Sequence, residues 1–178
     1  MPCEDSIKLH AGGVVSNVVM IGDKRKYNTC LITLKQVVDA EANSGQGGFK
    51  EELEGDAAEL SPSCTTAAQA AVDPTWIAHL REAISTYNAK VRRFSLGRCA
   101  ALCHALADSL QPFACLQDAV SNAAKVQKFS ILPHDFVFAG EDAELTATLK
   151  LKRPVVVRKC AAVIEAMYDG TGGVNVKG

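Results

Sequence analysis

Two lysines and an arginine stand close together near the end of the chain, in the stretch ELTATLKLKRP at 144–154. A lysine ammonium group is a compact positive charge on a flexible stem, so it can be brought to an anionic substrate. In an extended strand Lys150 and Lys152 would project to the same side, because successive side chains point to opposite faces. Two interpretations remain open: a solvated basic edge strand, or a loop that delivers one lysine to an anion.

Two other clusters could do chemistry, and each also has an ordinary structural explanation. The basic residues 24–26 lie in a short polar loop, which is either a solvated turn or a patch that faces phosphate or a partner. Cys99, Cys103 and His104 come nearest to a set of metal ligands. On a helix the two cysteines share a face while the histidine points elsewhere, so an apolar helix face is favoured and no metal site is expected.

The composition is that of one globular domain. The chain has 178 residues, 48% of them hydrophobic and 22% charged, with a formal net charge of −1. A near-neutral chain is not a general binder of nucleic acid. It has no apolar run of the roughly 18 residues that a membrane span needs, and its first ten residues lack the layout of a signal peptide. Seven cysteines without a Cys-x-x-Cys pair suit a reducing compartment. We expect a cytoplasmic or organelle protein, not secreted, with peripheral membrane association left open.

The elements that must position these residues mix β-rich runs with amphipathic helices. We expect an α+β fold, with a small sheet of about three strands and helices packed on it. Strands are expected at 17–21, 29–34 and 128–132, where β-branched and apolar residues are concentrated. Short helices are expected over 4–12 and 119–127.

Two further helices have recognisable start signals. Asp73-Pro74 opens the first, with Asp as N-cap and Pro in the first turn, and its apolar stripe comprises Ile77, Leu80, Ile84, Tyr87 and Val91. Pro154 begins the second, which Asp169-Gly170 ends, and one side of it carries Val157, Ala161, Ile164 and Tyr168.

Three segments have a different character. Residues 39–72, rich in Ala, Glu, Ser and Gly, predict a loop that contributes little to the core and tends to disorder. Residues 91–118 are rich in Ala and Leu and predict a helical segment broken near Gly97 and Pro112. The tail 171–178 is expected to be flexible.

Four segments together resemble one family: EDSIK near the start, SNVVMIGDKRKYNTCLITLK, AKVQKFSILPHDF and ELTATLKLKR, in this order. The resemblance is to the C-terminal lid domain of long-chain fatty acyl-CoA synthetases of the "bubblegum" type, within the AMP-forming adenylating superfamily that includes luciferase. It covers most of the chain outside 39–72 and 91–118, and it implies that residues 1–170 form this lid domain.

The resemblance implies a two-step reaction. A fatty carboxylate attacks the α-phosphate of ATP to give an acyl-adenylate, and the thiol of coenzyme A then displaces AMP. A large N-terminal adenylation domain would be the partner, and ATP, Mg²⁺ and coenzyme A would bind in the complete enzyme, with none held tightly by this chain.

The family motif also separates the two lysines. It reads small residue, spacer, lysine, apolar residue, any residue, arginine, and it falls on 148–153. The resemblance therefore implies that Lys150 is the catalytic lysine of adenylation. Thr148, Lys152 and Arg153 are implied to support binding of the nucleotide or of coenzyme A.

The sequence departs from the family pattern in three respects. The nucleotide loop and the ribose-binding aspartate are absent, so this chain alone is not expected to catalyse the full reaction; Glu4 matches the acidic residue that follows the family's hinge segment. Residues 91–118 look inserted. Ala143 and Ala147 stand where the family has Gly and Pro, which changes backbone freedom. The alternative is a non-catalytic truncated fragment, or a binding module that docks on another protein.

Overall fold

The fold is seen in a computed structural model, which describes residues 3–39, 48–105, 125–138, 140 and 142–177. Its centre is a mixed sheet in the order β1 (Val15–Ile21), β2 (Asn28–Leu34), β5 (Val126–Ile131), β6 (Val174–Asn175). β1 and β6 run antiparallel to their neighbours, while β2 and β5 are parallel. The α+β class is therefore confirmed.

The sheet has four strands, so the expected number of about three was too low. β6 is only two residues long and lies within 171–178, where no β-rich run exists to predict it. Tertiary contacts hold it in place: the Val176 N–H donates to the Gln127 carbonyl over 2.9 Å, and the Val176 side chain is buried.

Residues 48–72 are not the loop that composition predicted. β3 (Gln36–Asp39) and β4 (Gly48–Leu53) pair as a separate two-stranded sheet, followed by α2 (Asp56–Leu60) and α3 (Ala67–Ala70). These elements are too short to show a periodic pattern, but they bury apolar side chains, among them Leu53, Ala57, Cys64 and Ala67. Residues 40–47 lie outside the described residues.

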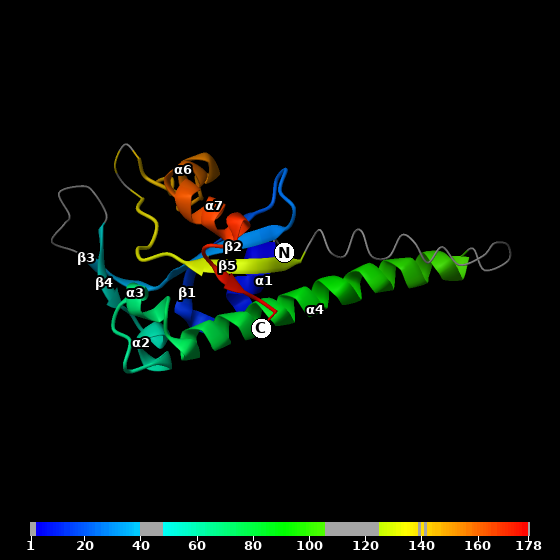
Figure 1. Cartoon of the computed structure of the whole chain (residues 1–178), viewed down its shortest axis with the longest axis horizontal. Coiled ribbons are helices and arrows are strands. Elements are labelled where there is room, and N and C mark those ends of the chain that lie inside the picture. The colour runs from blue at the N-terminus through cyan, green and yellow to red at the C-terminus, as the bar shows by residue number, and fades with distance from the viewer. Residues whose placement is uncertain (1–2, 40–47, 106–124, 139, 141, 178) are drawn as a thin grey trace.

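One face of the main sheet is covered by α1 (Cys3–His10), the short 3-10 helix η1 (Gly12–Val14) and α4 (Pro74–Ala105) (Figure 1). The core between them contains Ile7, Trp76, Leu80, Ile84 and Phe129. The predicted α4 stripe is confirmed at Leu80, Ile84 and Tyr87, but Trp76 rather than Ile77 is the buried residue of the first turn.

The predicted break near Gly97 is wrong, because α4 continues through this residue to Ala105. Pro112 and positions 119–124 lie outside the described residues. Positions 126 and 127, which we expected to end a short helix, begin β5 instead.

The opposite face is covered by α6 (Arg153–Lys159) and α7 (Ala161–Asp169) (Figure 1). We predicted one helix here, but the chain turns at Cys160 and forms two helices. The buried positions therefore differ from those expected for a single continuous helix. Val156, Ile164 and Met167 are buried, whereas Val157 and Ala161 are exposed. The predicted stop is confirmed, since Gly170 adopts the left-handed conformation with φ 84° after Asp169.

Candidate functional site

Residues 144–153, here called the Lys150 loop, form a tight loop and not an extended strand. Leu145 and Leu151 pair as an isolated antiparallel bridge. Beside this bridge the Lys152 N–H donates to the Glu144 carbonyl over 2.7 Å. The interpretation of this segment as a basic edge strand is therefore wrong, and the chain reverses direction between the two leucines.

Thr146 holds the interior of the loop. Its N–H donates to the Lys150 carbonyl over 2.8 Å, and its hydroxyl accepts from the Lys150 N–H over 3.0 Å. The same hydroxyl lies 3.0 Å from the Thr148 hydroxyl. Both backbone polar groups of Lys150 are thus bound to one residue, while its side chain is exposed.

Leu149 explains why the two lysines are not equivalent. Its φ is +58°, a left-handed conformation that is rare for a bulky residue, and its side chain is 67% exposed. Such a residue interrupts the alternation of an extended chain. Lys150 is exposed, whereas Lys152 is half-buried, and no pattern of alternating letters could have predicted this difference.

The four residues predicted for the site have different surroundings. Within the described part of the chain, the ammonium group of Lys150 has no hydrogen-bond or ion-pair partner. Thr148 is exposed beside Thr146. Arg153 is instead turned toward Glu4, with its Nη2 atom 2.6 Å from each carboxylate oxygen. Thr148 and Lys150 therefore share the tip of the loop, and Arg153 lies at its base.

Glu144 anchors the other end of the loop, and its role was missed in the sequence. Its carboxylate accepts from Lys159 Nζ over 2.7 Å and from the Val137 N–H over 3.2 Å. Its side chain is only 13% exposed. Lys159 lies on α6, fifteen residues further along the chain, so sequence spacing carries no signal for this contact.

The apolar side chains at the neck of the loop pack into the core on its side of the sheet. Leu145 is buried and Leu151 is half-buried against this core, which also contains Val156, Ile164 and Met167. This packing fixes the base of the loop to α6 and α7.

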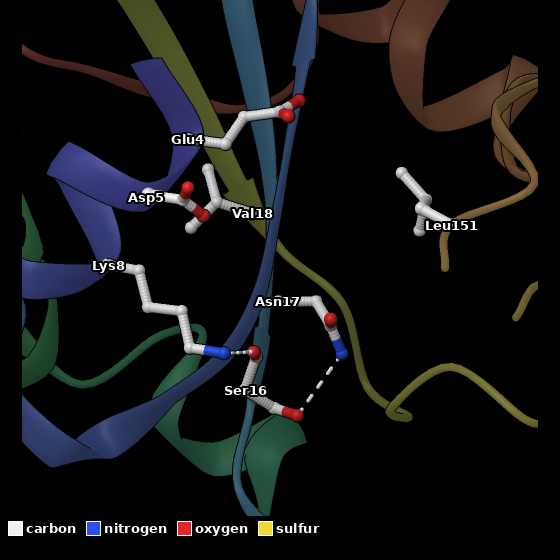
Figure 2. A pocket seen from close by; sticks show the side chains of 7 residues that line it. All are labelled: Glu4, Asp5, Lys8, Ser16, Asn17, Val18 and Leu151. Carbon is white, nitrogen blue, oxygen red and sulfur yellow. Dashed lines mark hydrogen bonds between the residues drawn. The ribbon is translucent and has the colours of Figure 1, made fainter. Parts of the chain in front are cut away.

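A pocket of about 160 Å³ lies between the loop and the first helix. Figure 2 shows Leu151 on one side and the side chains of α1 on the other, with residues 16–18 of β1 between them. Lys8 donates to the Ser16 carbonyl, and Asn17 Nδ2 donates to the Ser16 hydroxyl over 3.1 Å. Three of the polar residues drawn in this pocket, Lys8, Ser16 and Asn17, are thus linked to one another by hydrogen bonds.

The basic loop between β1 and β2 is partly a structural anchor. Arg25 forms an ion pair with Glu165 and stacks 4.8 Å from the centroid of the Tyr168 ring. Hydrogen bonding to this guanidinium holds the pKa of Glu165 below its ordinary value. The Tyr27 and Tyr168 rings lie 5.0 Å apart. Arg25 therefore fastens the hairpin to α7, while Lys24 and Lys26 stay exposed.

The described residues bear on metal ligation and on the hydropathy of the helices. No group of three or more His, Cys, Asp or Glu side chains comes together there to hold a metal ion. The side chains of Cys99, Cys103 and His104 lie outside the described part. No described helix is long and apolar enough to cross a bilayer.

Comparisons with known proteins point in one direction. No protein-family profile matches the chain, and no solved structure matches it. Curated proteins do match. A long-chain-fatty-acid–CoA ligase, ACSBG2 of Gallus gallus, is 31% identical over 174 residues, which are 94% of this chain and 18% of that protein. The ligase heimdall of Drosophila melanogaster is 32% identical over 86% of this chain and 21% of its own length.

A bacterial ligase is similar to the same extent. FadD15 of Mycobacterium tuberculosis, also a long-chain-fatty-acid–CoA ligase, is 29% identical over 93% of this chain and 20% of its own length. The chain thus spans about a fifth of the length of the curated relatives it matches. By its sequence this chain is therefore similar to the C-terminal part of the long-chain fatty acid–CoA ligases, and its α+β fold is consistent with that resemblance.

Proposed function

We propose that this chain acts as the C-terminal lid of a long-chain fatty acid–CoA ligase and that Lys150 supplies the positive charge for acyl-adenylate formation. In this reaction the fatty carboxylate bonds to the α-phosphorus of ATP and pyrophosphate leaves. The thiol of coenzyme A then bonds to the acyl carbon and AMP leaves. An N-terminal adenylation domain, as a partner, would hold the fatty acid and ATP with Mg²⁺.

The first step needs a cation because its two reactants repel each other. The carboxylate and the triphosphate are both anionic, and negative charge concentrates around the α-phosphorus in the transition state. A positioned ammonium group lowers the energy of that charge distribution more than it stabilises the separated reactants. Lysine suits this task because its charge is compact and its stem is flexible.

The observation that supports this role best is the contrast between the backbone and the side chain of Lys150. Its N–H and carbonyl are both bound to Thr146. Its side chain is exposed and has no partner among the described residues. Lys159 is already paired with Glu144, and Lys8 already binds the Ser16 carbonyl. Lys150 thus carries an exposed charge on a fixed backbone, and this charge is available to an anion on another domain.

The test uses a protein that carries this chain together with an adenylation domain. We expect Lys150→Ala to lower fatty-acid-dependent ATP–pyrophosphate exchange by at least about 10²-fold, the size of effect seen when one charge-stabilising group is removed. Lys35→Ala, at another exposed lysine, is the matched control and should leave exchange unchanged. Exchange at the wild-type rate by the Lys150 variant would reject the proposal.

A mixing experiment addresses the alternative of a non-catalytic binding module. The chain is added to a separately expressed N-terminal half, and formation of acyl-CoA is measured. Recovery of activity with the unaltered chain, but not with Lys150→Ala, supports the lid function. Binding without recovery favours the module that docks on another protein.

A further inference from the structure

We infer that Arg153 and Glu4 are positioning residues that fix the Lys150 loop to the first helix, and that Arg153 does not bind the nucleotide or coenzyme A. The resemblance implied a supporting ligand contact for Arg153, and its surroundings point elsewhere. The inference rests on the proposed function in one respect, because Lys150 is the group that would be positioned.

The contact joins three parts of the chain. Arg153 is the first residue of α6, Glu4 lies in the first turn of α1, and Met20 is on the edge strand β1. Arg153 Nη2 lies 2.6 Å from both oxygens of Glu4, and Arg153 Nη1 donates to the Met20 carbonyl over 3.2 Å. Glu4 accepts from the Met20 N–H over 2.8 Å. Both polar groups of one residue on the edge strand are therefore covered by the pair.

This geometry uses the features that make arginine different from lysine. The planar guanidinium binds both carboxylate oxygens at once and still reaches a third acceptor, so the orientation of its side chain is determined. The Arg153 side chain is 52% exposed, but its Nη2 atom already contacts the carboxylate of Glu4, whose side chain is only 20% exposed. A phosphate would have to compete with a carboxylate that is already in place.

The position of Arg153 explains what the pair would control. It directly follows the neck of the Lys150 loop, where the Lys152 N–H donates to the Glu144 carbonyl. Glu144 and Lys159 hold the loop on one side, and Arg153 and Glu4 hold it on the other. The second attachment connects the loop to α1. The orientation of the Lys150 loop is therefore coupled to the position of α1.

The test is a double-substitution cycle with Arg153→Ala, Glu4→Ala and both together, in a protein that also carries an adenylation domain. We expect each single change to lower the kcat of ATP–pyrophosphate exchange by about tenfold to 10²-fold, the scale of a misplacement near 1 Å, with the KM for ATP unchanged. The double variant should resemble the single ones, because the two side chains act as a unit. A ligand contact predicts instead a raised KM for ATP or coenzyme A in Arg153→Ala alone, and that result would overturn the inference.

A second measurement uses this chain alone and does not depend on activity. Amide hydrogen exchange at Lys150 and Lys152 should quicken in both Arg153→Ala and Glu4→Ala, while Arg158→Ala, which removes the exposed pair with Asp142, should leave it unchanged. Unchanged amide hydrogen exchange in Arg153→Ala and Glu4→Ala rejects the positioning role, even if Lys150 proves essential for activity. Faster amide hydrogen exchange in these two variants, together with full activity of Lys150→Ala, would reject the proposed function. The inference that Arg153 and Glu4 position the loop would still stand.

Discussion

Leu149 shows how one residue can change the meaning of a sequence pattern. The letters around it alternate as in a strand, yet its φ of +58° turns the chain so that Lys150 and Lys152 differ in exposure. A non-glycine residue in this conformation is strained by about 1–2 kcal/mol, because its Cβ approaches the following carbonyl. Strain of this kind is often found where a backbone must present a functional side chain.

The strain at Leu149 can be measured by two substitutions that differ mainly in backbone preference. Leu149→Gly removes the Cβ, whereas Leu149→Val adds a β-branch that disfavours the left-handed region further. Because the side chain is 67% exposed, little packing is lost in either variant. We expect the valine variant to be less stable than the glycine variant by about 1 kcal/mol or more in urea denaturation. Equal stabilities would mean that the loop does not hold this conformation in solution.

At the scale of elements, the long helix α4 depends on its first residues. The Asp73 carboxylate accepts from the Trp76 N–H over 3.1 Å and from the Thr75 N–H over 2.8 Å, so it caps the helix. These bonds, that from Trp76 above all, hold the pKa of Asp73 below its ordinary value. The third residue of the helix, Trp76, is completely buried, so the cap also fixes the helix over the core.

The lowered pKa predicts how this cap responds to acid. A carboxyl whose pKa is lower in the folded chain stabilises it fully above the ordinary pKa of 3.8 and loses that effect as the pH falls through the folded value. We expect Asp73→Ala to unfold at a lower urea concentration than wild type at pH 7. The difference between the two urea midpoints should become smaller below about pH 4.

The matched variant is Asp73→Asn, which keeps a neutral capping oxygen. Its advantage over Asp73→Ala should persist at low pH, because an amide does not titrate there. An unfolding midpoint for Asp73→Ala equal to that of wild type at pH 7 would show that the cap contributes nothing to stability.

Elements with strong local signals were the ones that the sequence could predict. The Asp73-Pro74 start of α4 and the Gly170 stop of α7 depend on nearby residues, and the β-rich runs identified β1, β2 and much of β5. The elements that were missed depend on distant contacts. β6 is paired by Lys128 and Phe129, and the short elements of 48–72 are held by burial rather than by a periodic pattern.

The same division applies to the candidate site. The register of the family motif selects Lys150, whose catalytic role stays a prediction, and no local pattern shows which groups hold its loop. Lys159, Glu4 and Met20 approach the loop from other elements. The left-handed Leu149 carries no glycine signal in the sequence. Sequence alone could therefore nominate a reactive side chain but could not describe the support around it.

At the scale of the whole molecule, one sheet separates two cores. Cys30 and Ile32 of β2 face the core beneath α1 and α4, and Leu31 between them faces the core beneath α6 and α7. The first core contains Trp76, the single tryptophan of the chain. The second core supports the Lys150 loop through Leu145 and Leu151. Because β2 contributes to both, the two layers should unfold together.

Truncations on the two sides test this coupling. Leu80 and Ile164 are buried in the first and second core, and replacing either with Ala should cost about 2–5 kcal/mol. Urea unfolding is followed by Trp76 fluorescence, which senses only the first core directly. We expect Leu80→Ala and Ile164→Ala both to lower the midpoint, in one cooperative transition. Val157→Ala, an exposed site on α6, is the control and should change it little.

The informative variant is Ile164→Ala, because its side chain is on the far side of the sheet from Trp76. A lowered midpoint would mean that packing beneath the Lys150 loop and packing around Trp76 belong to one cooperative unit, so that loosening the loop weakens the whole fold. An unchanged fluorescence midpoint, with loss of helical signal at lower urea, would show that α6 and α7 unfold separately. The Lys150 loop would then be attached to the less stable layer, and its position would depend on the Arg153–Glu4 contact with α1 even more strongly.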